Sequence, residues 1–303
     1  FYIDRNNFRG LTVSEVAGSG KNSSLMGRWE AAYGSNLDLI LRHNPHMAGF
    51  PSFSEMSKDV RDYVKKLYDL GLVADTREMI KERISKGGRI VVEGAQGVGL
   101  CVKHGTRPYI TRSHPCGCNL DADIGIPGFK PDKIIGVAKA YVTRVGEGPF
   151  PTEMKDGESG IAEQLVVLGK EYGTTTGRKR RPGWFDAVQA SYAASVAGVD
   201  VIALTKSDVL ARLPVDNFKI ATGYKRGDGP FVLHPSTEEM ADATFVEGFR
   251  PEYLEVDAFR DLREEGFDRY VGSIENLAGV PIRIITTGPE RNEFFARNLA
   301  HSL

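Results

Sequence analysis

The sequence predicts an α/β fold with a central, mostly parallel β-sheet flanked by helices. Two observations support this prediction. Apolar, β-branched runs that end in polar or glycine-bearing turns begin near residues 89, 132, 200 and 281. Segments with apolar residues at helical spacing lie between these runs. Strands that alternate with helices favour a parallel sheet, whose ligand crevice lies at the carboxyl ends of the strands.

The amino-terminal third is predicted to be helical and to lead into the first strand. Residues 54–86 carry apolar positions at helical spacing, which predicts two helices separated near Gly71. The Gly87-Gly88 pair stops the second helix. RIVVEGAQG, residues 89–97, then predicts a buried strand that carries a glycine loop to the edge of the sheet.

Three further strands are predicted in DKIIGVAKAYVTRVGEG, DVIALTKSD and PIRIITTGPE. Residues 186–198 and 269–279 predict helices that end at glycine. FKIATGYKRGDGPFVLH, residues 218–234, predicts a hairpin that turns at RGDG, a small antiparallel excursion from the sheet. The sequence shows no internal repeat and no obvious linker, so residues 1–303 are predicted to form a single domain.

Composition excludes several classes of protein. A chain of 303 residues can bury a sizeable core. Its 39 Lys and Arg against 40 Asp and Glu offer no general affinity for nucleic acid or anionic lipid. No run approaches the ~20 apolar residues of a spanning helix, so a membrane protein is not expected. Three cysteines are too few for a disulfide scaffold and indicate a reducing compartment, and we expect a cytoplasmic protein.

YGTTTGRKRRPGW, residues 172–184, is the densest chemical signal. Three hydroxyls and a glycine precede four consecutive cations. Arg binds carboxylate or phosphate through paired hydrogen bonds, and small neighbours let a ligand approach the backbone. A bare RKRR run would indicate a solvated basic loop. The TTTG prefix and Trp184 favour an oxyanion site instead.

ALTKSDVL places Lys206 and Asp208 at the end of the strand that begins near Asp200. An Asp there can accept hydrogen bonds from the N1–H and 2-amino groups of guanine, while the Lys stem lies along the base. Adenine lacks that pair of donors, so this arrangement selects GTP over ATP. A T-K-x-D match alone is weak, and an ordinary strand end is the alternative.

Three weaker segments have equally plausible structural interpretations. EGAQGVGL, followed by HGTRPYIT, offers the Gln96 amide to a purine edge, although a tight turn fits as well. TRVGEGPFPTEM, which contains Arg144, is a Gly-rich loop stiffened by Pro. ITTGPER could close over a base or form a plain turn.

Two other segments resemble known motifs but do not match them. Cys116 and Cys118 lack the second cysteine pair of a zinc site, so no metal site is predicted. AGSGKNSS, residues 17–24, resembles a phosphate loop. However, Glu15 replaces the first glycine of that motif and Asn22 replaces its hydroxyl.

Taken in order, EGAQG, HGTRPYIT, TRVGEGPFPTEM, GTTTGRKRRPGW, LTKSDVL and TTGPER resemble the adenylosuccinate synthetase family, from about Arg89 to Arg291. The resemblance implies a fold like that of the P-loop NTPases. It also implies a GTP-dependent carbon-nitrogen ligase of AMP biosynthesis that joins IMP to L-aspartate. GTP phosphorylates the 6-oxygen of IMP, and the aspartate amine then displaces phosphate to give adenylosuccinate and GDP. Mg²⁺ and a homodimer are further expectations.

The resemblance also implies roles for individual residues. Those implied for IMP are Ser19, Arg28, Gln96, Thr111 and Arg178, with Gln96 and Arg178 also expected to be catalytic. Those implied for aspartate are Val145, Thr174, Thr175, Thr176, Gly177, Arg178 and Arg180. Those implied for GTP are Arg180, Lys206, Ser207, Asp208, Thr286, Thr287 and Gly288.

The chain departs from the family pattern at its start. The family's G-D-E-G-K-G loop, with a general base and a metal contact, has no counterpart here, and neither does the histidine acid that follows it. We expect a segment preceding Phe1 to supply these groups and most of the Mg²⁺ ligands. Without it, the chain should bind nucleotides poorly and catalyse nothing. GSGKNSSLMGRW is a loose counterpart of the family's G-T-T-G-R-G segment, which is the basis for Ser19 and for Arg28 as the arginine that crosses the dimer interface.

Two alternatives stay open at this point. DADIGIP, residues 121–127, resembles the compact archaeal and phage branch of the family. Some phage relatives convert dGMP to 2-aminoadenylosuccinate, often with ATP. The T-K-x-D pair and the complete TTTGR loop favour GTP and IMP. The other alternative is an inactive nucleotide-binding paralogue.

Overall fold

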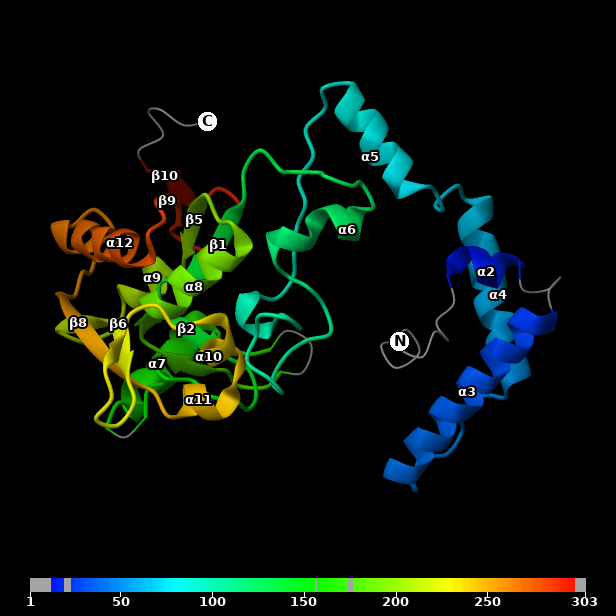
Figure 1. Cartoon of the computed structure of the whole chain (residues 1–303), viewed down its shortest axis with the longest axis horizontal. Helices are drawn as coiled ribbons and strands as arrows, with labels where there is room; N and C mark the ends of the chain where they lie inside the picture. Colours follow the sequence, from blue (N-terminus) through cyan, green and yellow to red (C-terminus); the bar gives the residue numbers. More distant parts are fainter. Residues whose placement is uncertain (1–11, 19–22, 156, 174–176, 298–303) are drawn as a thin grey trace. The chain divides into compact units, whose positions relative to one another are not determined.

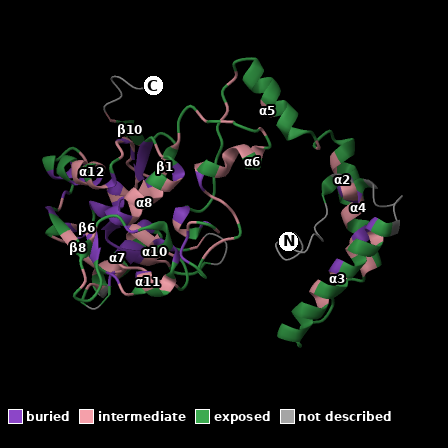
Figure 2. Cartoon of the chain, viewed as in Figure 1, coloured by how far each residue is buried: buried purple, intermediate pink, exposed green. Residues whose placement is uncertain are grey.

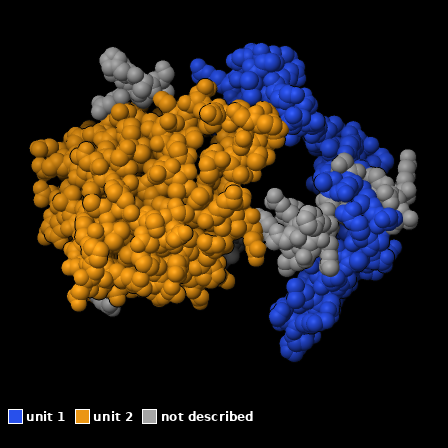
Figure 3. All heavy atoms as spheres, viewed as in Figure 1, with its two compact units in different colours: residues 1–91 blue, residues 92–303 orange. Residues whose placement is uncertain are grey.

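The structure, a computed structural model, describes residues 12–18, 23–155, 157–173 and 177–297 (Figure 1). It divides into two compact units, residues 1–91 and 92–303 (Figure 3). A single domain over residues 1–303 stays a prediction. None of the described helices combines the length and the apolar character that crossing a membrane requires.

The first unit is helical. Its helices are α2 (Val13–Gly18), α3 (Ser23–His43), α4 (Phe53–Asp69) and α5 (Thr76–Ser85). Ser52 begins α4 in a capping box with Glu55, and Asp75 caps α5 by accepting from the Glu78 amide. Gly71 adopts a φ of 67° after α4, a left-handed conformation that ends a helix without steric cost in glycine. The predicted pair of helices is therefore confirmed.

The helices of the first unit bury few side chains. Trp29 of α3 packs edge-on against Phe53 of α4, with 5.7 Å between ring centroids. Val16 and Val64 are buried, whereas Leu39 and Ile40 on α3 are exposed (Figure 2). The apolar contact that stabilises this unit is therefore small compared with that of the second unit.

The second unit contains the central sheet. Its strands are β1 (Ile135–Lys139), β5 (Val201–Thr205), β9 (Ile282–Thr286) and β10 (Phe294–Ala296), in the order β1-β5-β9-β10. β1, β5 and β9 are parallel, and β10 pairs antiparallel with β9. These strands coincide with three of the predicted apolar runs, so the mostly parallel α/β fold is confirmed.

A second sheet contains the antiparallel excursion. It consists of β4 (Phe185–Asp186), β6 (Asn217–Lys225), β7 (Phe231–Val232) and β8 (Arg250–Asp257). β6 and β7 form the predicted hairpin around RGDG, with Tyr224 opposite Val232. A separate two-stranded ribbon pairs β2 (Val142–Arg144) with β3 (Arg181–Gly183).

Helices surround these strands. The longer ones are α7 (Ser159–Gly169), α8 (Ala187–Ala197) and α12 (Glu265–Ala278). The shorter ones are η2 (Val98–Leu100), η3 (Gly117–Asn119), α6 (Leu120–Ile124), α9 (Ser207–Leu210), α10 (Thr237–Ala241) and α11 (Ala243–Glu247). α8 and α12 end at Gly198 and Gly279, both left-handed, which confirms the two predicted helices. α12 begins four residues before the predicted start.

The main core lies between the central sheet and the helices. Ile202 and Leu204 of β5 and Ile282 of β9 pack with Val271 and Ile274 of α12 in one cluster of buried side chains (Figure 2). These positions are apolar because the middle strand of a parallel sheet is covered on both faces. The core holds β1, β5 and β9 in place relative to one another. It therefore also fixes the positions of their carboxyl ends.

The predicted strand at residues 89–97 is wrong. Residues 88–95 form neither helix nor strand, and Val91 is 92% exposed. A strand requires a neighbour that pairs with its backbone amides and carbonyls. Within the described part of the chain, no strand pairs with this segment, and β1 pairs with β5 on one edge only. An apolar, β-branched run is therefore not sufficient to form a strand in this segment.

Candidate active site

The carboxyl ends of β1 and β5 place two cations close together. Lys139 is the last residue of β1 and lies opposite Thr205, the last residue of β5. Lys206 follows directly, with a φ of 64°, and begins α9. Left-handed backbone is uncommon for a residue with a side chain and often marks a functional position.

The segment that we call the arginine loop, residues 171–180, lies beside these strand ends. Its two ends are joined by a hydrogen bond of 2.9 Å from the Arg180 amide to the Glu171 carbonyl. Further in, the Gly173 amide donates to the Arg178 carbonyl and the Gly177 amide to the Gly173 carbonyl, each at 2.8 Å. The described parts of the loop, residues 171–173 and 177–180, thus run antiparallel to each other, with Arg178 exposed and Arg180 partly buried.

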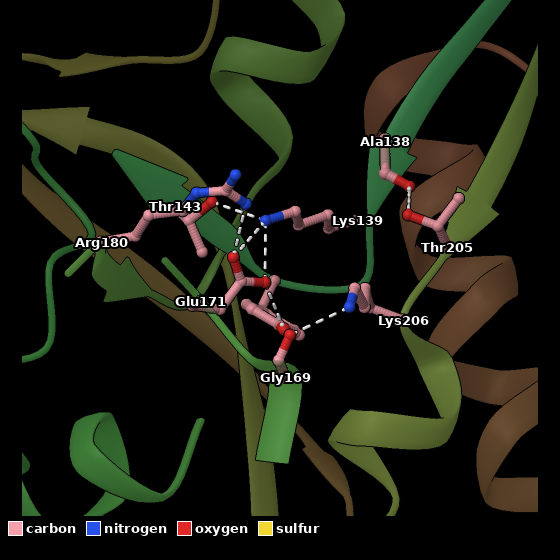
Figure 4. A network of polar contacts seen from close by, with 9 residues as sticks. Ala138, Lys139, Thr143, Gly169, Glu171, Arg180, Thr205 and Lys206 are labelled. Carbon is pink, nitrogen blue, oxygen red and sulfur yellow. Dashed lines mark hydrogen bonds and ion pairs between the residues drawn. The ribbon is translucent and has the colours of Figure 1, made fainter. Parts of the chain in front are cut away.

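One buried carboxylate connects the arginine loop to β1 (Figure 4). Lys139 Nζ donates to both oxygens of Glu171 at 2.7 and 2.8 Å, and Arg180 Nη1 donates to Oε2 at 2.8 Å. The Tyr141 hydroxyl adds a third donor at 2.7 Å. The Glu171 side chain is only 1% exposed, against 24% for Lys139 and 25% for Arg180.

The pKa values of this network follow from burial and pairing. Burial opposes ionisation of Glu171, but hydrogen bonds from Lys139 and Tyr141, together with the Lys139 charge, outweigh it and hold the pKa of Glu171 below its ordinary value. Burial lowers the pKa of Lys139, and the Glu171 carboxylate opposes that shift. Burial, followed by the neighbouring Glu171, raises the pKa of Tyr141. Tyr141 therefore acts as a hydrogen-bond donor, and Glu171 is the anion of the network.

A second contact joins the end of α7, just before the arginine loop, to the residue that follows β5. Lys206 Nζ donates to the Gly169 carbonyl at the end of α7 at 3.0 Å (Figure 4). Thr205 Oγ1 donates to the Ala138 carbonyl of β1 at 3.2 Å. The arginine loop is therefore joined to the end of β1, and the residues that lead into the loop are held at the end of the adjacent parallel strand β5.

The loop that contains Val145 is tied to the arginine loop through the next residue in the chain. Arg181 forms a bidentate pair with Glu153, in which both nitrogen-to-oxygen distances are 2.6 Å. Its Nη1 also donates to the carbonyls of Gly146 and Gly148. β2 pairs with β3 so that Arg144 lies opposite Arg181. The residues implied for aspartate, Val145 and Arg180, thus come from adjacent, mutually braced segments.

The residues implied for guanine lie at the ends of β5 and β9. Arg212 donates from Nη2 to Asp208 Oδ2 at 2.8 Å and from Nε to the Asp208 carbonyl at 3.1 Å, which holds the carboxylate in place. Ser207 is fully buried, and its Oγ has no hydrogen-bond partner in the described part of the protein. Thr286 ends β9, the strand that pairs with β5 on the side away from β1. The set is therefore gathered at one edge of the sheet.

Two residues implied for IMP are joined by a third. Ser113 Oγ donates to Gln96 Oε1 at 2.8 Å, and the Ser113 and Thr111 hydroxyl oxygens lie 3.4 Å apart. Gln96 adopts a φ of 68°, so its backbone is held in a conformation that side chains disfavour. The structure thus places Gln96 and Thr111 side by side.

Some predicted site residues cannot be placed with these groups. Ser19 and Thr174 to Thr176 lie outside the described residues. Arg28 lies on α3 in the first unit, where its Nη2 is 4.0 Å from Glu15 Oε1. The roles implied for these five residues stay predictions.

Sequence reasoning missed Lys139, Glu171 and Arg181. Lys139 is the lone charged residue at the end of a strand run, and Glu171 directly precedes the hydroxyl-rich motif. A charged residue next to a predicted ligand loop is the signal that could have identified both. Arg181 was included only as part of a run of four cations, three of which the structure shows to have different partners.

The described residues hold no group of three or more His, Cys, Asp or Glu side chains that could bind a metal ion. Cys101 and Cys116 are buried, and burial together with the neighbouring thiols raises the pKa of Cys116 to about 12. A thiol with so high a pKa stays protonated and is a poor metal ligand. Mg²⁺ prefers oxygen ligands, so these thiols are not candidates for it, and we assign its site to no cluster of described side chains.

Comparisons with known proteins agree with this arrangement. The sequence profile of a family described as adenylosuccinate synthetase matches residues 4–295. The adenylosuccinate synthetase of Desulforamulus reducens is 39% identical over 246 residues, which cover 80% of this chain and 56% of the relative. That of Pelotomaculum thermopropionicum is 40% identical over 274 residues, 87% of this chain and 62% of the relative. The chain thus spans little more than half the length of the curated relatives it matches.

A solved structure shows the same fold. The fully ligated adenylosuccinate synthetase from Plasmodium falciparum aligns with a TM-score of 0.82, covering 98% of this chain and 68% of that chain at 24% sequence identity. The profile match spans nearly all of the chain, and three of the motifs, GTTTGRKRRPGW, LTKSDVL and TTGPER, lie beside the ends of β1, β5 and β9. The chain belongs to the adenylosuccinate synthetase family.

Proposed function

We propose that the protein is a ligase that joins IMP to L-aspartate with GTP as the energy donor and forms adenylosuccinate, GDP and phosphate. One observation carries the proposal: the arginine loop is joined to Lys139 at the end of β1, and Gly169, just before the loop, accepts from Lys206 directly after β5. This anchoring sets the oxyanion-binding motif beside the motif implied for guanine. Ligands of open α/β sheets bind at this edge.

The chemistry requires anion binding and precise positioning. The γ-phosphoryl group of GTP is transferred to the 6-oxygen of IMP, which gives GDP and a 6-phosphoryl intermediate. The aspartate nitrogen then bonds to C6 as the C6–O bond breaks and phosphate leaves. Phosphoryl transfer depends mainly on alignment and charge neutralisation. Arg178 and Arg180 supply guanidinium groups for the aspartate carboxylates and the phosphate.

The nucleotide contacts are assigned from the groups that lie together. The Gln96 amide can donate and accept at the purine edge of IMP, with Thr111 held next to it by Ser113. The Asp208 carboxylate, held by Arg212, accepts from the N1–H and 2-amino groups of guanine. The Lys206 stem lies along the base, and Thr286, Thr287 and Gly288 cover it. Val145 and Gly177 complete the aspartate contacts.

Mg²⁺ completes the proposal as the ion that neutralises phosphate charge during transfer. No described cluster of side chains provides its site. A homodimer and a cytoplasmic location are also proposed, because they are expected for this family. Sedimentation analysis of the purified protein tests the dimer.

Steady-state assays of the protein expressed from its gene test the proposal. IMP or dGMP is combined with GTP or ATP in the presence of aspartate and Mg²⁺, and formation of the succinyl nucleotide is followed. We expect turnover with IMP and GTP. Turnover with dGMP instead would assign the 2-aminoadenylosuccinate reaction, and no turnover with any pair would indicate a nucleotide-binding paralogue.

A further inference from the structure

The strand ends gather an excess of positive charge around a single buried acid. Lys139, Arg180 and Lys206 lie near enough to one another that the charges of Arg180 and Lys206 act on Lys139. Glu171 is the carboxylate that pairs with two of these cations, and it is almost completely buried. Asp208, which pairs with Arg212, is the other carboxylate of these strand ends, so two acids face four cations and the strand ends attract an anionic ligand.

The Arg180 guanidinium is only partly used by the protein. Of its five N–H donors, Nη1 contacts Glu171, and none of the other described residues accepts from the Arg180 side chain. The contact is charge-assisted, and its acceptor cannot move because Lys139 and Tyr141 hold the same carboxylate. One side of the guanidinium is thereby fixed, and the remaining donors are available to a ligand.

Glu171 differs from the other acid that contacts the same run of cations. Glu163 on α7 pairs with Lys179, but both side chains are more than half exposed. Exposed pairs of this kind contribute little to stability or to geometry. The Glu171 pair is buried, is shared by three donors, and lies at the closed end of the loop.

We infer that Glu171 is a positioning residue that sets the Arg180 guanidinium toward the anionic groups of the substrates. The inference rests on the proposed function only for the identity of the anion, which is the aspartate carboxylate. Glu171 itself does not touch substrate. It acts through Arg180, and not through Arg178, which lies at the exposed part of the loop.

The test compares Glu171→Gln with Glu163→Gln. Glu171→Gln keeps the shape of the side chain but replaces one acceptor oxygen with an NH₂ group that faces a cation. Loss of a charge-assisted contact of about 1.4 kcal/mol should raise the KM for aspartate about 10-fold. The KM for IMP and kcat should change less than about threefold, because Arg178 and Gln96 are untouched. Glu163→Gln should leave all three constants within about twofold of the wild-type values.

A double-mutant cycle with Arg180→Lys shows whether the effect passes through Arg180. If it does, introducing Glu171→Gln into the Arg180→Lys protein leaves the KM for aspartate unchanged. Introducing it into the Arg178→Lys protein raises that KM by the same factor as in the wild type. Full additivity with Arg180→Lys, or an unchanged aspartate KM in Glu171→Gln, would overturn the inference. If Glu171→Gln does not fold, Glu171→Asp replaces it. This variant keeps the charge that balances Lys139 and shortens the reach to Arg180, so it carries the same expectations.

Two measurements need no turnover and separate this inference from the proposed function. Hydrogen exchange of the Gly173, Gly177 and Arg180 amides should be unchanged in Glu171→Gln, since their acceptors are backbone carbonyls. Rapid exchange at all three amides would show that Glu171 is needed for the structure of the loop, and it would overturn the positioning role. The side-chain ¹⁵Nε signal of Arg180 in the ligand-free protein should broaden or collapse toward that of a free arginine in Glu171→Gln only. An inactive wild-type protein with these signatures would refute the proposed function and leave the positioning role supported.

Discussion

The arginine loop and the glycine segment, residues 93–99, were both predicted to contact nucleotide or substrate, yet they are held in different ways. The arginine loop carries its own support: backbone hydrogen bonds close it, and a buried carboxylate joins it to β1. The glycine segment follows residues that form no strand; Gln96 accepts a hydrogen bond from Ser113, and Val98 packs at the far end of the segment against Cys101. The same kind of motif can therefore be stabilised locally or depend on its surroundings.

The difference shows what a ligand-binding loop needs in addition to its motif. Ten consecutive residues and one strand end suffice for the arginine loop, because Glu171 and Arg180 lie at its two ends. The glycine segment has no paired strand in front of it among the described residues, and its support lies behind it, where Val98 is buried. Substitutions in the arginine loop should thus affect ligands, whereas the glycine segment should tolerate changes wherever its backbone is open.

The largest effect is expected from Arg178→Leu in the arginine loop. Removing a guanidinium that meets phosphate and carboxylate should lower kcat/KM at least about 100-fold, as loss of a positioned transition-state donor does. Steady-state assays with IMP, aspartate and GTP measure this. Lys179→Leu is the matched control, because Lys179 is the adjacent cation and pairs with the exposed Glu163. Near-normal kinetics in Arg178→Leu would remove that arginine from the mechanism.

The cap of α8, which follows the arginine loop and β3 along the chain, should respond to pH. Asp186 follows β3 closely, caps α8 and accepts from the Tyr224 hydroxyl at 2.5 Å. Burial raises its pKa to about 6, although the bonds from Tyr224 and from backbone amides oppose the shift. Because the folded-state pKa lies above the unfolded value, this group stabilises the fold most below about pH 4 and loses that contribution as pH rises through about 6.

Asp186 should change the free energy of unfolding by about 3 kcal/mol across this pH range. Its folded and unfolded pKa values differ by roughly two, and each pKa unit corresponds to about 1.4 kcal/mol. Urea unfolding of the wild type and of Asp186→Asn between about pH 4 and pH 7 measures it, since the other groups titrate alike in both proteins. The stability of the wild type relative to the variant should fall as pH rises. A difference that does not change with pH would show that Asp186 ionises normally in the folded protein.

Asp208→Asn tests the β5 end of the same edge. An Asn amide presents a donor where the 2-amino group of guanine also donates, so the preference for GTP over ATP should drop about 10- to 100-fold. The KM for IMP should change little. Xanthosine triphosphate, whose 2-carbonyl accepts at that position, should regain activity with the variant. An unchanged GTP preference, or no gain with xanthosine triphosphate, would count against the guanine assignment.

The sequence predicted the local features of the fold well, because they depend on neighbouring residues. Gly198 and Gly279 end α8 and α12, and RGDG turns the β6–β7 hairpin. It also identified Arg180 and Asp208 from motifs. It missed Glu171 and Lys139 because their pairing joins residues 32 positions apart, which no local pattern reveals. The wrong strand at residues 89–97 has the same cause, since pairing depends on a distant partner.

The smallest effects are expected from alanine substitutions at two glycines, Gly94 in the glycine segment and Gly105 shortly after it. The two substitutions should differ in their effect on stability. A Cβ at Gly105 would lie 2.6 Å from the Gly99 carbonyl oxygen and 2.7 Å from that of Cys101, and backbone atoms cannot yield cheaply. Gly105→Ala should therefore lower the free energy of unfolding by about 1–3 kcal/mol. A Cβ at Gly94 would meet nothing within 4 Å, so Gly94→Ala should change it by less than about 0.5 kcal/mol.

Gly94→Ala also decides between the two interpretations of EGAQG. If its glycines let IMP approach the backbone, Gly94→Ala should raise the KM for IMP several-fold, about 1 kcal/mol, with unfolding unchanged. If the segment is only a tight turn, neither quantity should change. Denaturant unfolding and the IMP titration, measured on the same preparation, distinguish these outcomes. A loss of stability in Gly94→Ala would mean instead that the glycine segment is packed in solution, which would remove the contrast with the arginine loop.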